Sequence, residues 1–134
     1  MRIVPDQSLE DAKGPWDLIV LPGGFENSVN LSKNARVQDL LRTQVASGAL
    51  TAAICAAPMA LDAAGILPEG QYTCYPGVDS RLRTPGRLDN ALVDTPQVVT
   101  SQGPATSIAF ALHLVGRLVG EAKQKQVASD LLYR

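Results

Sequence analysis

Cys55 is the residue of this 134-residue sequence that is best placed to do chemistry. It follows the apolar run 49–54 and precedes Pro58, with Ala53 and Ala57 two positions away on either side. A strand that turns sharply into a helix at a nucleophile needs small residues there, because the turn is too tight for larger side chains. The pattern therefore predicts a nucleophile elbow with cysteine in place of serine. The helix N-terminus would favour a thiolate, and the N–H of Ala56 could stabilise an oxyanion.

A buried structural thiol is the alternative for Cys55, since unpaired cysteine is among the most buried residue types. A second candidate element is the segment 21–24, Leu-Pro-Gly-Gly, which ends the preceding apolar run. Ligand sites of open parallel sheets form outside the carboxyl ends of the strands, and glycine lets backbone N–H groups approach a ligand closely. A plain turn is the alternative for this segment.

Short apolar runs and helical patterns alternate along the chain, which predicts an α/β fold with a mostly parallel sheet and helices on both faces. The runs 16–21 and 49–54 resemble buried strands, 71–75 a third strand, and 91–93 with 97–101 a hairpin or two short strands. Helices are expected around 37–45, from Pro58 to Gly65, from Gly103 onward and over 121–132. Asn30 or Ser32 would cap the first of these, and Gly48 would end it. The third would carry one apolar side, made of Ile108, Leu112, Val115 and Val119.

The charge balance excludes several classes of function. With 12 Lys+Arg against 13 Asp+Glu, the net charge is -1, which argues against a nucleic-acid-binding surface. Arg81, Arg83 and Arg87 are expected in a solvated loop. No apolar run is long enough to span a membrane, and two cysteines with one histidine leave little for a metal site. We expect no metal, no organic cofactor, no nucleic-acid or membrane partner, and a cytoplasmic location.

Several motifs, in order and spacing, resemble the ThiJ/PfpI superfamily. They are Val4-Pro5-Asp6 and the segments 17–24, 52–58, 100–106 and 127–132. The chain is most similar to the branch of the Parkinson-disease-associated protein deglycase, the glutathione-independent glyoxalases and their bacterial relatives. The resemblance implies a flavodoxin-like, doubly wound sheet. It also implies that residues 1–134 form a single domain without the family's N-terminal strand-helix-strand, a unit of about 30 residues or more.

The resemblance assigns roles to individual residues. Cys55 would be a reactive, peroxide-sensitive nucleophile, and the amides of Gly24 and Ala56 would form the oxyanion hole. Gly23, Tyr75, Gln102 and Pro104 would line the substrate pocket. The implied activity is a glyoxalase or protein deglycase acting on methylglyoxal or on early glycation adducts of proteins and amino acids. The thiolate adds to an aldehyde, a proton shifts between carbons, and a thioester is hydrolysed.

The chain departs from the family pattern at three points. The family glutamate that hydrogen-bonds the cysteine has no counterpart, and neither Asp17 nor Glu26 matches its motif. Tyr75 stands where some members have histidine, and a phenol is a poor base near neutral pH. Gln102 stands where many relatives have arginine, which removes a cation that could bind an anionic group.

Two further residues have less specific interpretations. His113, the only histidine, lies within the long helix and is expected to be structural or solvent-facing. Cys74 is expected to be a small core residue, with a resolving thiol as the alternative. Adjacent strand residues face opposite sides, so Cys74 and Tyr75 cannot both point at Cys55.

The family usually forms homodimers, and we expect one here. Two alternative functions stay open at this point. One is a peroxide-sensing or chaperone-like stress protein in which Cys55 is oxidised. The other is an inactive or partial remnant that needs a second polypeptide.

Overall fold

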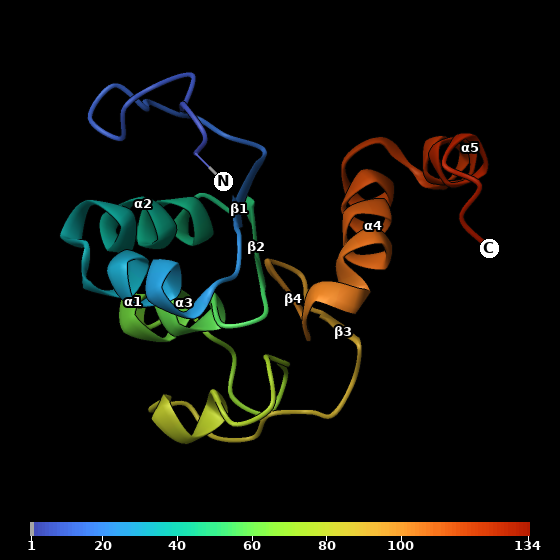
Figure 1. Cartoon of the computed structure of the whole chain (residues 1–134). Coiled ribbons are helices and arrows are strands. Elements are labelled where there is room, and N and C mark those ends of the chain that lie inside the picture. The colour runs from blue at the N-terminus through green and yellow to red at the C-terminus, as the bar shows by residue number, and fades with distance from the viewer. Residues whose placement is uncertain (1) are drawn as a thin grey trace.

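The computed structural model describes residues 2–134 and has one four-stranded sheet at its centre. The strand order is β1-β2-β4-β3, and only β3 runs antiparallel to its neighbour. Figure 1 shows α1, α2 and α3 on one side of this sheet and α4 on the other, with α5 projecting beyond α4. The expected α/β class, with helices on both faces of a mostly parallel sheet, is confirmed. The strands are β1 (Leu18–Leu21), β2 (Leu50–Ile54), β3 (Leu92–Asp94) and β4 (Val98–Ser101). The helices are α1 (Phe25–Lys33), α2 (Ala35–Ala46), α3 (Pro58–Ala64), α4 (Ser107–Val119) and α5 (Glu121–Asp130), with short 3-10 turns at Asp79–Arg81 and Pro104–Thr106.

The hydrophobic core has two clusters, one on each face of β2, and both are built mainly from alanines and aliphatic residues. On one face, Leu41 of α2 and Leu61 of α3 pack around Ala53, and all three are fully buried. On the other, Val99 lies with Ala52 against α4. Small side chains on β2 allow the helices to approach closely, so the start of α3 is fixed directly at the end of this strand.

The beginnings and ends of the helices follow local signals, with one correction. Pro58 opens α3, and Gly65 ends it in the left-handed region at φ 76°, as predicted. The cap of α2 is Asn34, whose side chain accepts a hydrogen bond from the Val37 N–H at 3.1 Å. The prediction of Asn30 or Ser32 was wrong, because a further helix, α1, occupies those positions.

The predicted third strand at 71–75 is not a strand. Only Tyr72 forms an isolated bridge, to Arg87. The Thr73 N–H instead donates to the side-chain oxygen of Thr100, and the Tyr75 N–H donates to the carbonyl of Cys55. The segment therefore crosses the carboxyl end of the sheet rather than extending it, which brings Tyr75 to the elbow.

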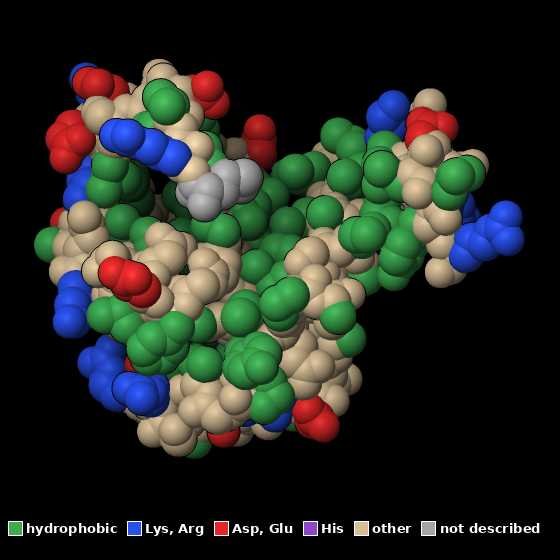
Figure 2. All heavy atoms as spheres, in the orientation of Figure 1, with side chains coloured by type: hydrophobic (Ala, Val, Ile, Leu, Met, Phe, Trp, Pro, Cys, Tyr) green, Lys and Arg blue, Asp and Glu red, His purple; other side chains and the backbone are tan. Residues whose placement is uncertain are grey.

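One side of the sheet is left open along β1, which within residues 2–134 pairs only with β2. Val20 of β1 is exposed. Part of the apolar side predicted for α4 is exposed as well, since the exposed fraction is 52% for Ile108 and 64% for Val119. The buried face of α4 is instead built from Phe110, Leu112 and Leu114. The predicted stripe was wrong for Ile108 and Val119, because the side of α4 that carries them is turned away from the buried cluster that Phe110 and Leu114 join. Figure 2 shows hydrophobic side chains along the recess between α4 and the rest of the molecule.

Candidate active site at the Cys55 elbow

Cys55 lies between the end of β2 and the start of α3 in a backbone conformation that is rare for side-chain-bearing residues. Its φ is 64°, in the left-handed region, which costs about 1–3 kcal/mol in a non-glycine residue. Two hydrogen bonds hold it there: its N–H donates to the Ser101 carbonyl at 3.0 Å, and its carbonyl accepts from the Tyr75 N–H at 2.9 Å. The thiol is half-buried, whereas its flanking residues Ala53 and Ala57 are fully buried. The strained turn and its small neighbours are the features of a nucleophile elbow.

Gly23 packs directly against this cysteine. A Cβ at position 23 would lie 2.7 Å from the Cβ of Cys55, 3.1 Å from the Ile54 carbonyl oxygen and 3.4 Å from the Cys55 sulfur. Only glycine fits in that space. The glycines at the end of β1 therefore hold the loop against the elbow, which places a second backbone segment beside the sulfur.

The neighbouring Gly24 adopts φ 91° and precedes α1. Its carbonyl accepts from the Ser28 N–H at 2.9 Å and from the Ser28 hydroxyl at 2.7 Å. The side chain of Asn27 donates to the Pro22 carbonyl at 3.1 Å and to the Gly23 carbonyl at 3.2 Å. Sequence reasoning missed Asn27 and Ser28, because a polar residue in the first turn of a helix carries no signal of which loop it will hold.

The backbone N–H groups of Gly24 and Ala56 are available as hydrogen-bond donors. Neither N–H donates to an acceptor among residues 2–134. The carbonyls of Gly24 and Ala56, by contrast, do accept hydrogen bonds, from Ser28 and Met59. Free donors next to an elbow can stabilise negative charge that develops on a carbonyl oxygen.

A cavity of about 260 Å³ lies beside the elbow and is named here the Gln102 cavity. Its walls come from two segments that are both hydrogen-bonded to the backbone of Cys55, one through Tyr75 and one through Ser101. The ring of Tyr75 packs on Gly103, where a Cβ would lie 3.3 Å from the ring. The structure thus groups Tyr75, Gln102 and Pro104 in one cavity, and places Gly23 at the cysteine itself. The cavity is lined by Tyr75, Pro76, Gln102, Gly103, Pro104, Ala105 and Thr106.

Arg87 and Asp89 are hydrogen-bonded to residues in and beside the cavity wall, which sequence reasoning did not foresee. Arg87 Nε donates to the Cys74 carbonyl at 3.0 Å, and its Nη2 donates to Asp89 Oδ1 at 3.0 Å. Gln102 Nε2 donates to the same Asp89 oxygen at 2.8 Å. The prediction of a solvated arginine loop was wrong for Arg87, whose side chain is only 14% exposed. Asp89 is two residues from Arg87, but Cys74 is 13 residues from Arg87 and Gln102 is 13 residues from Asp89, so no local pattern identifies the whole link.

Cys74 is a buried core residue, as expected. Burial, with the carboxylate of Asp79 nearby, raises the pKa of its thiol to about 11. A thiol that stays protonated near neutral pH is a weak nucleophile, which argues against a resolving role. Tyr75, next along the chain, is half-exposed, so the two side chains face opposite ways.

No carboxylate of residues 2–134 is hydrogen-bonded to the Cys55 sulfur, and Asp17 and Glu26 are both exposed to solvent. Within the same range, no three histidine, cysteine or acidic side chains are grouped as metal ligands. No helix in the described part of the chain is long and apolar enough to cross a bilayer.

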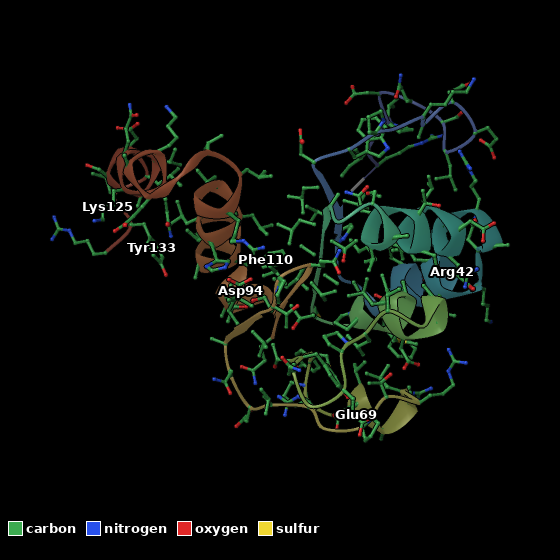
Figure 3. All side chains as sticks on the ribbon, turned by 180° about the vertical axis from the view of Figure 1, so that it is seen from behind. Arg42, Glu69, Asp94, Phe110, Lys125 and Tyr133 are labelled. Atoms are coloured by element: carbon green, nitrogen blue, oxygen red, sulfur yellow. The ribbon has the colours of Figure 1, made fainter. Side chains whose placement is uncertain are left out.

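His113 is engaged elsewhere in the molecule. Its Nε2 lies 2.9 Å from Asp94 Oδ2, though not at a hydrogen-bonding angle, and Asp94 also pairs with Arg117. Figure 3 shows Asp94 at the base of α4, near Phe110. Arg117 further donates to the Pro96 carbonyl at 2.8 Å. This cluster fastens α4 to the β3–β4 hairpin, which agrees with the structural role expected for His113.

Comparison with known proteins decides the family. The model of the DJ-1/PfpI family matches residues 1–117 of the chain. The chain belongs to the DJ-1/PfpI family. The resemblance found in the sequence and the flavodoxin-like fold expected from it are both confirmed.

Curated members of the DJ-1/PfpI family are similar over almost the whole chain. Protein DJ-1alpha of Drosophila melanogaster is 40% identical over 98% of the chain, and the chain spans 62% of that protein's length. The Parkinson disease protein 7 homolog of Danio rerio is 39% identical, and the chain spans 74% of it. The glutathione-independent glyoxalase DJR-1.2 of Caenorhabditis elegans is 41% identical over 97% of the chain, which spans 70% of that protein.

A solved structure of the DJ-1/PfpI family superposes closely. Crystalline DJ-1beta of Drosophila melanogaster matches with a TM-score of 0.92 at 36% identity, covering 100% of the chain and 74% of that structure. Oxidized DJ-1 of Toxoplasma gondii matches with a TM-score of 0.82 at 31% identity, covering 93% of the chain and 67% of that structure.

Proposed function

We propose that this chain is a cysteine-dependent glyoxalase or deglycase-type hydrolase that acts on methylglyoxal or on early glycation adducts. The observation that carries the proposal is the backbone of Cys55, held at φ 64° at the end of β2 with Gly23 packed against it. Strained residues held by their surroundings gather at active sites. The 41% identical glyoxalase DJR-1.2 supports the choice of reaction.

The chemistry on methylglyoxal proceeds in three steps. The sulfur of Cys55 adds to the aldehyde carbon, and the carbonyl oxygen takes a proton, which gives a hemithioacetal. The hydrogen on that carbon then leaves as a proton, and the neighbouring ketone carbon gains one, so that the hemithioacetal becomes a thioester. Water cleaves the C–S bond of the thioester, which yields lactate and restores the thiol.

The backbone around Cys55 supplies what these steps need. In the first and third steps negative charge develops on the oxygen attached to the reacting carbon, and the free N–H groups of Gly24 and Ala56 are the donors proposed for it. Proton movement in the second step is proposed to pass through solvent at the half-exposed thiol, because no carboxylate of residues 2–134 contacts the sulfur.

Lactate formation from methylglyoxal, without glutathione, tests the proposal. Wild type and Cys74→Ala are expected to produce lactate, and Cys55→Ala is not. Cys74→Ala is the matched control, because it removes the other thiol of the chain. Equal rates for wild type and Cys55→Ala would reject the enzymatic role of Cys55.

A peroxide-sensing function is the second candidate, and the contrast between the two thiols favours it. Cys55 is half-buried and open to a small oxidant, whereas Cys74 is fully buried with its pKa raised to about 11. Mild peroxide followed by peptide mass spectrometry should find oxidation at Cys55 first. Earlier oxidation of Cys74 would count against a sensor.

A partial chain that needs a second polypeptide is the third candidate, and the open side of β1 favours it. The expected homodimer also stays a prediction. Sedimentation of the purified chain, alone and with soluble extract from the source cells, distinguishes a self-associating protein from one that binds a different chain.

A further inference from the structure

Asn27, in the first turn of α1, holds the loop that packs against Cys55. Its Nδ2 donates to the Pro22 carbonyl at 3.1 Å and to the Gly23 carbonyl at 3.2 Å. Because carbonyl oxygens can only accept, the side-chain nitrogen must face them, and Oδ1 of Asn27 is directed away from them. The side chain therefore fixes two successive carbonyls of the loop on its own side.

The peptide between Gly23 and Gly24 takes its orientation from this contact. A trans peptide is planar with its N–H opposite to its C=O, so the Gly24 N–H points away from Asn27. Two glycines in succession have no Cβ that would favour one orientation of the peptide between them. Of the side chains in residues 2–134, only Asn27 is bonded to the Gly23 carbonyl. This one side chain therefore selects the orientation.

A residue at this place in a helix commonly has the opposite effect. Asn27 is the third helical residue after the cap, which is Gly24. In a capping box, an acceptor side chain at that position, usually Glu or Gln, reaches back to the N–H of the cap residue. Such a contact would stabilise the helix and use up the Gly24 N–H. Here the amide donates to the preceding carbonyls instead, and the Gly24 N–H meets no acceptor in the described part of the chain.

We infer that Asn27 is a positioning residue, which keeps the Gly24 N–H free and turned away from α1 as an oxyanion donor beside Cys55. The inference rests on the proposed function, because a free donor matters where negative charge develops at a reacting carbon. The side chain acts through the peptide between Gly23 and Gly24 and needs no contact with the reacting atoms.

Asn27→Glu separates this positioning from a purely structural role. The carboxylate only accepts, so the variant loses both carbonyl contacts and takes the Gly24 N–H as in a capping box. Since glutamate also suits the first turn of a helix, the Tm should stay unchanged or rise. The kcat for lactate formation from methylglyoxal should fall about 100-fold, as on loss of one oxyanion donor, with little change in KM.

Two further variants complete the kinetic test. Asn30→Glu makes the same replacement at an exposed position of the same helix and should leave kcat unchanged. Asn27→Ala removes the donor without adding an acceptor, so the peptide can take either orientation. It should lower kcat by a smaller factor than Asn27→Glu does.

Amide hydrogen exchange of Gly24, measured by NMR on isotope-labelled protein, tests the geometry without turnover. In the wild type this N–H should exchange about as fast as the same amide in an unstructured peptide, because it is exposed and unbonded. In Asn27→Glu it should exchange more slowly by about tenfold, since it is then bonded to a carboxylate. Asn30→Glu should keep the wild-type rate.

Four results would each overturn the assignment: wild-type kcat in Asn27→Glu or Asn27→Ala, an equal loss in Asn30→Glu, a loss of kcat that only follows a lower Tm, or an unchanged Gly24 exchange rate in Asn27→Glu. A wild type that makes no lactate rejects the proposed function instead. If Gly24 exchange still slows in Asn27→Glu of such a protein, the loop geometry stands without the glyoxalase activity.

Discussion

Replacing Gly23 by alanine should reduce the reactivity of Cys55 far more than it reduces stability. The added methyl group would lie 2.7 Å from the Cβ of Cys55 and 3.1 Å from the Ile54 carbonyl oxygen. Carbon atoms in favourable contact lie about 3.5–4.0 Å apart, so the two loops must separate by about 1 Å. Overpacking of this kind costs about 1–3 kcal/mol. A displacement of about 1 Å at a reacting group can cost a factor of about 100 in rate.

The assay pairs lactate formation from methylglyoxal with thermal unfolding. We expect Gly23→Ala to form lactate roughly 100-fold more slowly than wild type, with a Tm lowered by roughly 4 °C for each kcal/mol lost. Gly48→Ala is the control, because Gly48 has φ 81° but open space around it. It should lose about 1–2 kcal/mol from backbone strain alone and leave Cys55 as reactive as in wild type.

Two results would refute the reasoning. If Gly23→Ala reacts as fast as wild type, the loop does not constrain the elbow. If Gly48→Ala slows lactate formation as much as Gly23→Ala does, the effect comes from general destabilisation rather than from contact with Cys55.

Further predictions concern three single side chains. The buried carboxylate of Asp62 accepts hydrogen bonds from the Arg83 N–H, the Thr84 N–H and the Thr84 hydroxyl. Asp62→Ala should therefore lower the free energy of unfolding, measured in urea, by about 2–3 kcal/mol. A loss below about 0.5 kcal/mol would contradict this prediction. Burial raises the pKa of Asp62, but the hydrogen bonds from Thr84 and Arg83 outweigh it and lower the pKa below the ordinary 3.8. Its stabilisation is therefore complete above that pH and lost as the pH falls through the lowered value, and Asp62→Asn should flatten the stability curve there. Cys74, whose thiol has a pKa of about 11, should not react with Ellman's reagent at pH near 8 until the chain is unfolded. Cys55 should react in the native protein. Two rapidly reacting thiols in the folded protein would disprove the burial of Cys74. Asn34→Ala should cost about 1 kcal/mol by removing the α2 cap, with Asn30→Ala, inside α1, as a comparison that lacks this loss.

Features of the fold encoded in neighbouring residues could be predicted from the sequence. The run that ends in Ile54, the small residues beside Cys55 and Pro58 together specify the elbow, because strand, turn and helix signals agree over ten positions. The helix α1 was not predicted, since it begins at Phe25 after a glycine that offers no side-chain cap. Residues 71–75 have the composition of a strand, but their backbone groups pair with Thr100 and Cys55 across the end of the sheet.

The candidate site was predictable only where a motif marks it. Cys55, Gly23 and Gly24 stand in recognisable segments, and the structure places them together. The link from Arg87 through Asp89 to Gln102 joins two loops whose proximity depends on the whole fold, so residue type alone could not reveal it. Similarly, the composition of α4 shows which residues are apolar but not which side the sheet will cover.

The open side of β1 has a consequence for solubility. Its sequence, Leu-Ile-Val-Leu, is uncharged and has high β-propensity, and within residues 2–134 no strand pairs with its outer edge. Such an edge is a template on which strands of other molecules can add, and short segments of this composition stack into cross-β fibres. Asp17 and Pro22 stand immediately before and after it. A charge and a proline beside an apolar strand are the residue types that oppose strand addition, so Asp17→Ala is the substitution expected to make this edge more prone to aggregation.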